Sequence, residues 1–264
     1  MSFQSKLGIF SLLLASSIYG FYGVLSRFIG LQFGTFFQVW TRNFVIIFIL
    51  AVYSFFKKNW QNIKKFDYKG FLSMSFCGTI SVATMFAAFS RLLIGNCLFV
   101  FYSGSTIGGY LLGKFVFKEN LTKVKIISLL ISLSGLFLIF FGSFKINNPT
   151  FTFVAFISGV TGSGWNILSK KISSRYPFNQ IMSIDFFISM VFGFFLFLVV
   201  KEKFFLPSIN LSWIVLFIYS IASLVASVLT IHGFKHLEAQ IGSLVMLSEA
   251  VFGITYSWLF FEKL

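Results

Sequence analysis

The chain has 264 residues, of which 57% are hydrophobic and only 11% are charged, and its mean hydropathy is +0.90. These values exclude an ordinary soluble domain and predict an all-α polytopic membrane protein. The net charge of +14 would favour nucleic-acid binding in a soluble protein. Here the Lys and Arg residues lie in short segments between apolar runs, where membrane topology explains them. We therefore expect the lipid bilayer, and no nucleic acid, as a partner.

Apolar runs of about 20 residues, long enough to cross a bilayer as helices, follow one another along the chain. We expect nine spans, at residues 7–28, 34–56, 71–90, 94–116, 124–141, 151–169, 180–200, 211–234 and 238–261. A cleaved signal peptide is an alternative at the N-terminus, but the apolar character continues to Leu25, which favours a retained helix. All three prolines fall between the predicted spans, so an interruption inside a helix should come from Gly and Ser.

The distribution of basic residues predicts the orientation, because Lys and Arg accumulate in cytoplasmic loops. With the N-terminus in the cytoplasm, 14 of the 21 Lys and Arg residues fall on the cytoplasmic side and 6 on the other side, with Arg42 inside the second span. The opposite orientation would invert this bias. We therefore expect a cytoplasmic N-terminus.

The two halves of the chain resemble each other at a fixed offset of 143 residues. Residues 23–29, GVLSRFI, align with 166–172, NILSKKI, and 117–121 align with 260–264 at three positions. Two blocks in one register indicate a duplication, with residues 1–143 as the first repeat and 144–264 as the second. Because 143 residues contain five predicted spans, the second repeat is expected to be inverted in the membrane, as is common in secondary transporters.

Two segments carry a resemblance to a known family: 94–122, IGNCLFVFYSGSTIGGYLLGKFVFKENLT, and 237–264, LEAQIGSLVMLSEAVFGITYSWLFFEKL. They resemble the drug/metabolite transporter superfamily, in the branch with two EamA-like halves. Members typically show there a helix rich in Gly and Ala, often with a Glu-Pro pair or a lone Pro, that ends in an acidic residue. Here Ala250 replaces the proline, and Glu119 and Glu262 match the terminal acid.

The resemblance implies a permease of the bacterial inner (cytoplasmic) membrane that moves a small-molecule substrate by alternating access, most often by exporting an amino acid or a related metabolite. The family plan has ten helices, so the last helix of the second repeat is expected to be missing here. A homodimer or another partner would cover the flank left bare. The alternatives are a non-transporting membrane assembly subunit and a permease for nucleotide-like or drug-like solutes.

We expect no enzymatic activity, cofactor or metal. The sequence contains no Gly-rich phosphate loop, no paired His on one helix face, and no Ser, His and Asp set at a common depth.

The last predicted span carries a carboxylate, Glu249, near its middle. An ionised carboxylate in the hydrocarbon core costs roughly 3 kcal/mol on insertion scales, so Glu249 should face protein or water and is a candidate functional residue. At spacings of 4, 3, 4 and 3 residues, one face of this helix carries Gly242, Met246, Glu249, Gly253 and Tyr256.

The fourth predicted span presents a similar face with Tyr102, Thr106, Gly109 and Gly113, in which Thr106 is the counterpart of Glu249 at the offset of 143. We expect the two faces to line a substrate cavity from opposite sides. For the glycines, close packing between helices is the favoured interpretation.

Two further charges lie inside predicted spans, Arg42 and Asp185. Glu249 is the expected partner of Arg42, because buried charges are usually paired. For Asp185 the alternative to a cavity position is the inner interface, facing Lys235, His236 or Lys170.

Aromatic and amide side chains on the first and sixth spans should complete the cavity wall, since such a lining suits a metabolite with an apolar body and polar ends. Aromatic packing between helices is the alternative. The predicted substrate-binding residues are Tyr19, Tyr22, Arg42, Tyr102, Thr106, Trp165, Asn166, Asp185, Glu249 and Tyr256.

Overall fold

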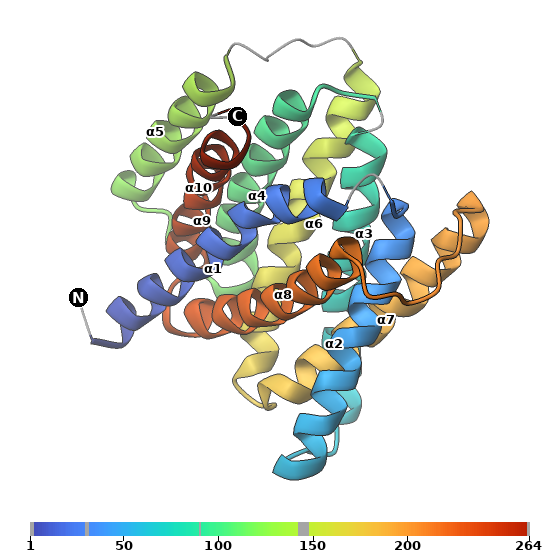
Figure 1. The fold of residues 1–264 in the computed structure, drawn as a ribbon. Helices are drawn as coiled ribbons and strands as arrows, with labels where there is room; N and C mark the ends of the chain where they lie inside the picture. The colour runs from blue at the N-terminus through green and yellow to red at the C-terminus, as the bar shows by residue number, and fades with distance from the viewer. Residues whose placement is uncertain (1–2, 30–31, 90, 142–147, 263–264) are drawn as a thin grey trace.

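The computed structural model describes residues 3–29, 32–89, 91–141 and 148–262, and all regular secondary structure within them is helical (Figure 1). The main helices are α1 (Phe3–Ile29), α2 (Thr35–Lys57), α3 (Tyr68–Phe89), α4 (Ile94–Phe117), α5 (Lys123–Phe140), α6 (Pro149–Ser173), α7 (Phe178–Val200), α8 (Leu211–His236), α9 (Ala239–Met246) and α10 (Ser248–Ser257). A single turn, η1 (Lys65–Asp67), precedes α3, and a π-helical turn, η3 (Trp258–Glu262), follows α10. The expected repeat boundary at 143/144 lies outside the described residues.

Among the described residues, eight helical stretches are long and apolar enough to span a membrane. Nine were expected, and the difference is α4, which has the length of a span, 24 residues, but is rich in Gly. This composition suits its position, since α4 packs against α6, α9 and α5. Small residues let helices approach closely inside a bundle, at the expense of mean hydropathy.

The ninth predicted span is a broken helix. α9 ends at Met246 and α10 begins at Ser248, and at Leu247 the hydrogen bonds tighten to three-residue spacing. Ser248 Oγ donates to Val245 O at 2.8 Å, and such back-bonding competes with the helical ladder and bends it. A serine thus lies at the break, and no proline does.

The element boundaries repeat at the offset seen in the sequence. Adding 143 to the bounds of α2, 35–57, gives 178–200, the bounds of α7, and adding it to 68, where α3 begins, gives 211, where α8 begins. α2 is followed by Lys58 and α7 by Lys201, each in the left-handed conformation, with φ of 48° and 57°. The two halves thus share a backbone plan down to their helix caps.

The packing of the helices follows the same twofold pattern. α1 packs along α8 as α6 packs along α3, α1 contacts α9 and α10 as α6 contacts α4, and α2 packs along α7. The long contact of α1 with α8 is visible in Figure 1. With five spans in the first repeat, this exchange of equivalent helices is the arrangement of an inverted repeat.

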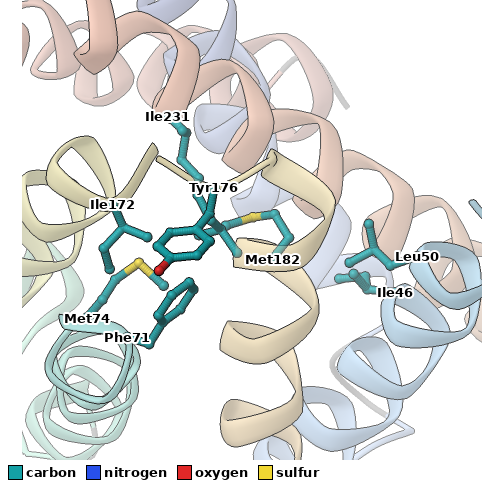
Figure 2. Packing of buried hydrophobic residues seen from close by; sticks show 9 residues of the cluster. Ile46, Leu50, Phe71, Met74, Ile172, Tyr176, Met182 and Ile231 are labelled. Atoms are coloured by element: carbon teal, nitrogen blue, oxygen red, sulfur yellow. The ribbon is translucent and has the colours of Figure 1, made fainter. Parts of the chain in front are cut away.

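The connections at one end of the bundle are held by ion pairs, and we call this the ion-paired end. All three ion pairs of the described residues lie here and join the first half of the chain to the second, namely Asp67 with Arg175, Glu119 with Lys170 at 3.3 Å, and Lys125 with Glu238 at 2.5 Å. Beneath them lies an apolar cluster in which the ring of Tyr176 packs on Phe71, with centroids 5.1 Å apart (Figure 2).

The opposite end is rich in aromatic rings, and we call it the aromatic end. Phe33 and Phe37 contact Trp213, with ring centroids 5.1 and 6.0 Å apart, and Trp40 contacts Phe197. The N-terminus of α2 is capped here by Glu202, whose carboxylate accepts from the Phe37 N–H at 2.7 Å. The two ends therefore differ in chemistry, one ionic and one apolar.

Candidate functional site

A cavity of about 410 Å³ lies between the two halves of the chain. Every main helix except α5 contributes to its wall, and eight of the ten predicted residues line it. These eight are Tyr19, Tyr22, Arg42, Tyr102, Trp165, Asn166, Asp185 and Glu249. Its size is that of a site for a small organic molecule.

Glu249 reaches the cavity from the first turn of α10, directly after the break at Leu247. Its Oε1 accepts a hydrogen bond from the Tyr102 hydroxyl at 3.1 Å. Tyr102 lies on α4, so this bond joins equivalent helices of the two halves. The carboxylate thus faces protein and cavity, as the cost of exposing it to lipid requires.

Asp185 also lies in the cavity wall, where it is only 5% exposed. Its Oδ2 accepts from the indole N–H of Trp165 at 2.8 Å, while its Oδ1 has no hydrogen-bond partner within the described chain. The alternative that placed Asp185 against Lys170 is wrong, because Lys170 pairs with Glu119 instead. Lys235 and His236 likewise form no ion pair with it among the described residues.

Arg42 lies over the ring of Tyr219, with its guanidinium carbon 3.9 Å from the ring centroid. Its Nε also donates to Gln38 O at 3.3 Å. The expected ion pair with Glu249 is not formed, because Tyr102 holds the carboxylate and the Tyr219 ring holds the cation. A cation on an aromatic face is stabilised without losing its charge, so the charge of Arg42 remains available to an anionic group in the cavity.

Three tyrosines form one side of the cavity. The ring of Tyr22 packs on Tyr19 and Tyr219, with centroids 5.1 and 4.5 Å away. Tyr19 shares a 3.5 Å hydrogen bond with Ser227, whereas the buried hydroxyl of Tyr22 has no partner in the described chain. The wall is therefore aromatic with isolated polar atoms, a lining that suits a mixed apolar and polar solute.

Two predicted residues do not line this cavity. Thr106 is 1% exposed and its hydroxyl donates within α4, to Tyr102 O at 2.8 Å. Tyr256 lies one helix face away, where its hydroxyl is 2.5 Å from Ser17 Oγ on α1. Helical spacing places a residue on one side of its own helix but does not show which neighbouring helices cover that side, so it misplaced both.

The glycines of the predicted faces serve close packing, as the favoured interpretation held. A Cβ on Gly109 would collide with the side chain of Ser243, and one on Gly113 would meet Glu119 at 2.9 Å. The sequence reasoning missed Tyr219, which carries Arg42. The offset of 143 gave no signal for it, because its counterpart is Phe76.

Comparison with known proteins matches the chain to the EamA-like transporter family over residues 6–141 and again over 150–264. The chain belongs to the EamA-like transporter family. It is thus a multi-pass membrane protein of the drug/metabolite transporter type, as the resemblance implied. No curated protein matches it at the same stringency.

Solved structures support the fold. Of the 28 chains that match, one is a crystal structure of a protein with a TM-score of 0.79 and 11% identity, covering 97% of this chain and 88% of its own. At that identity the likeness concerns the fold alone. The EamA-like transporter therefore shares its helix arrangement with a solved structure.

Proposed function

We propose that this EamA-like transporter exports amino acids or related metabolites by alternating access, with the cavity as the substrate site. The observation that carries the proposal is the separation of opposite charges. Arg42 rests on Tyr219 while Glu249 is held by Tyr102, so neither neutralises the other. An amino acid has a carboxylate for Arg42 and an ammonium group for an acid, so it complements both.

The aromatic wall supports the same class of substrate. Tyr19, Tyr22 and Trp165 offer apolar surface beside the charged groups, and a side chain or hydrocarbon body packs well there. A purely apolar drug would leave Arg42 and Glu249 without an oppositely charged partner in a dry cavity, which costs free energy.

The two ends of the bundle support alternating access. The cavity wall extends from Asp185 to Phe36 and Phe86, which lie toward the aromatic end. At the ion-paired end three ion pairs hold the halves together. With the N-terminus in the cytoplasm of a bacterial cell, the ion-paired end is cytoplasmic, and we infer that this conformation faces outward from the inner membrane.

The test is counterflow in proteoliposomes loaded with unlabelled amino acid and presented with the labelled one. Candidates come first from a thermal-shift screen of amino acids, nucleotides and sugars in detergent, because a ligand that binds the native state raises Tm. We expect counterflow of at least one amino acid, weakened in Arg42→Gln. Counterflow of only nucleotides or apolar drugs would contradict amino acids as the substrate class. Purification with a stoichiometric partner and no counterflow would instead favour an assembly subunit.

A further inference from the structure

Four oxygen-bearing side chains face one another between α3 and α7. Ser75 and Thr79 are one helical turn apart on α3, and Asp185 and Ser189 are one turn apart on α7. Thr79 Oγ1 and Ser189 Oγ are 3.4 Å apart. Since α3 and α7 both begin at the ion-paired end, Ser75 and Asp185 lie one turn closer to that end on the same two helices. Thr79, Asp185 and Ser189 also line the cavity.

Two atoms of this oxygen cluster lack the partners that buried polar atoms require. Asp185 Oδ1 and Ser75 Oγ are buried without a hydrogen bond in the described chain, although Ser75 is 0% and Asp185 5% exposed. Leaving such atoms unsatisfied costs about 1–3 kcal/mol each. Trp165 donates only to Oδ2.

The chemistry of the cluster matches a small hard cation. Carboxylate and hydroxyl oxygens are the ligands that such cations prefer. The described residues contain no group of three or more His, Cys, Asp or Glu that would hold a divalent or transition metal. A single carboxylate among hydroxyls balances a single positive charge, and no Lys or Arg forms an ion pair with Asp185 in the described chain.

The other half of the chain shows that the cluster is not a by-product of the duplication. At the offset of 143, Ser75 and Thr79 correspond to Ile218 and Ala222, and Ser189 corresponds to Ile46. Asp185 itself corresponds to Arg42. The first half thus places a permanent cation where the second places an unpaired carboxylate surrounded by hydroxyls.

We propose that Ser75, Thr79, Asp185 and Ser189 form a binding site for a sodium ion, which enters from the cavity and is transported with the substrate cycle. Binding stands on the oxygen cluster alone. Only the coupling to transport rests on the proposed function. Sites for coupling ions near the midplane of inverted-repeat transporters have the same location relative to the halves.

The experiment measures thermal unfolding of the purified protein in detergent in sodium, potassium or choline chloride at equal ionic strength. Sodium at ten times its Kd should raise Tm by about 3 °C over choline, because it binds only the native state. Asp185→Asn and Ser189→Ala should abolish the shift. Ser223→Ala, a cavity hydroxyl on α8, and Glu249→Gln, the other cavity carboxylate, should retain it.

Misfolding of Asp185→Asn does not obscure the result, because Ser189→Ala removes one oxygen from a cavity-lining position and each variant is first checked by size exclusion. Equal Tm of the wild type in sodium and choline overturns the site. So does a shift that follows pH rather than sodium, since this identifies a proton, or a sodium shift that survives in both variants.

Transport is then measured separately. Counterflow that is independent of sodium, in a protein that binds sodium, overturns the coupling and leaves the site. Sodium binding without counterflow of any amino acid overturns the proposed function instead.

Discussion

The two halves of the chain have one backbone plan and different chemistry. α4 in the first half is a continuous helix of 24 residues, whereas its equivalent in the second half is divided at Leu247 into α9 and α10. At the equivalent depth, α4 has Thr106, closed off inside the bundle, and α10 has Glu249, facing the cavity. The break is therefore associated with the exposure of the carboxylate to the cavity.

The same contrast holds elsewhere in the cavity. Arg42 and Asp185 occupy equivalent positions with opposite charges, while Lys58 and Lys201 end equivalent helices in the same left-handed conformation. The two halves thus share the backbone conformation at these helix ends but differ in the side chains that line the cavity. Substitutions at equivalent positions of the two halves therefore test whether a residue supports the fold or contacts the solute.

The largest effect is expected from Glu249→Gln. Loss of the charge removes the partner of a substrate ammonium group, and we expect counterflow to fall about 100-fold, in line with the roughly 1.5–3 kcal/mol of a hydrogen bond to a charged group. The matched control is Thr106→Val at the equivalent position, which should retain most activity. The double variant Glu249→Thr with Thr106→Glu should not transport, because Thr106 lies outside the cavity. Transport by this double variant would show that the two positions are interchangeable.

Arg42→Lys should have the next largest effect. Lysine keeps the charge but loses the planar guanidinium that lies on Tyr219, so we expect the KM for amino acid to rise about tenfold with a smaller change in maximal rate. Initial rates of exchange over a range of substrate concentrations give both parameters. A change confined to maximal rate would argue against a direct contact with the substrate.

Glu119→Gln should destabilise the junction between the halves. The Glu119 carboxylate is 7% exposed, accepts the Ala239 N–H at 2.7 Å at the start of α9, and pairs with Lys170. Losing its charge should lower the unfolding free energy by roughly 2 kcal/mol, measured as a fall in Tm. Glu238→Gln is the control, because that side chain is 50% exposed and its pair should contribute below about 1 kcal/mol. Equal losses would refute the distinction.

The smallest effect is expected at the helix caps. Lys58→Gly and Lys201→Gly each replace a side chain that is strained at positive φ, and we expect each to raise stability by about 1 kcal/mol. The rise in Tm should be equal for the two, since the caps are equivalent. Unequal changes in Tm would show that the two caps are not energetically equivalent.

Much of the fold followed from the sequence because apolar runs of bilayer length leave few choices of structure. The offset of 143 likewise predicted the alignment of α2 with α7. The break at Leu247 was not predicted, because serines are common in continuous helices. Ser163 and Ser169 make the same backward hydrogen bond as Ser248 inside the unbroken α6.

The cavity was less accessible to sequence reasoning. Helical periodicity predicted that Glu249 and Tyr102 line a common site. It could not show that Arg42 lies over the ring of Tyr219, which has no polar counterpart in the first half. The depth of Asp185 could be predicted from the sequence, but the side of α7 on which it lies could not. Which face of α7 meets α3 is decided by packing over many residues, which the local pattern does not contain.

The division at Leu247 also has a mechanical consequence. α10 has ten residues and is therefore about 15 Å long. A bend of about 10° at the junction would displace its far end by ~2.6 Å, but Glu249, two residues from the junction, by less than ~1 Å. The carboxylate would move little in such a bend, whereas η3, which follows α10 and carries Phe261 against Arg27, would move further. Such a bend would therefore leave the Glu249 carboxylate close to a solute bound in the cavity.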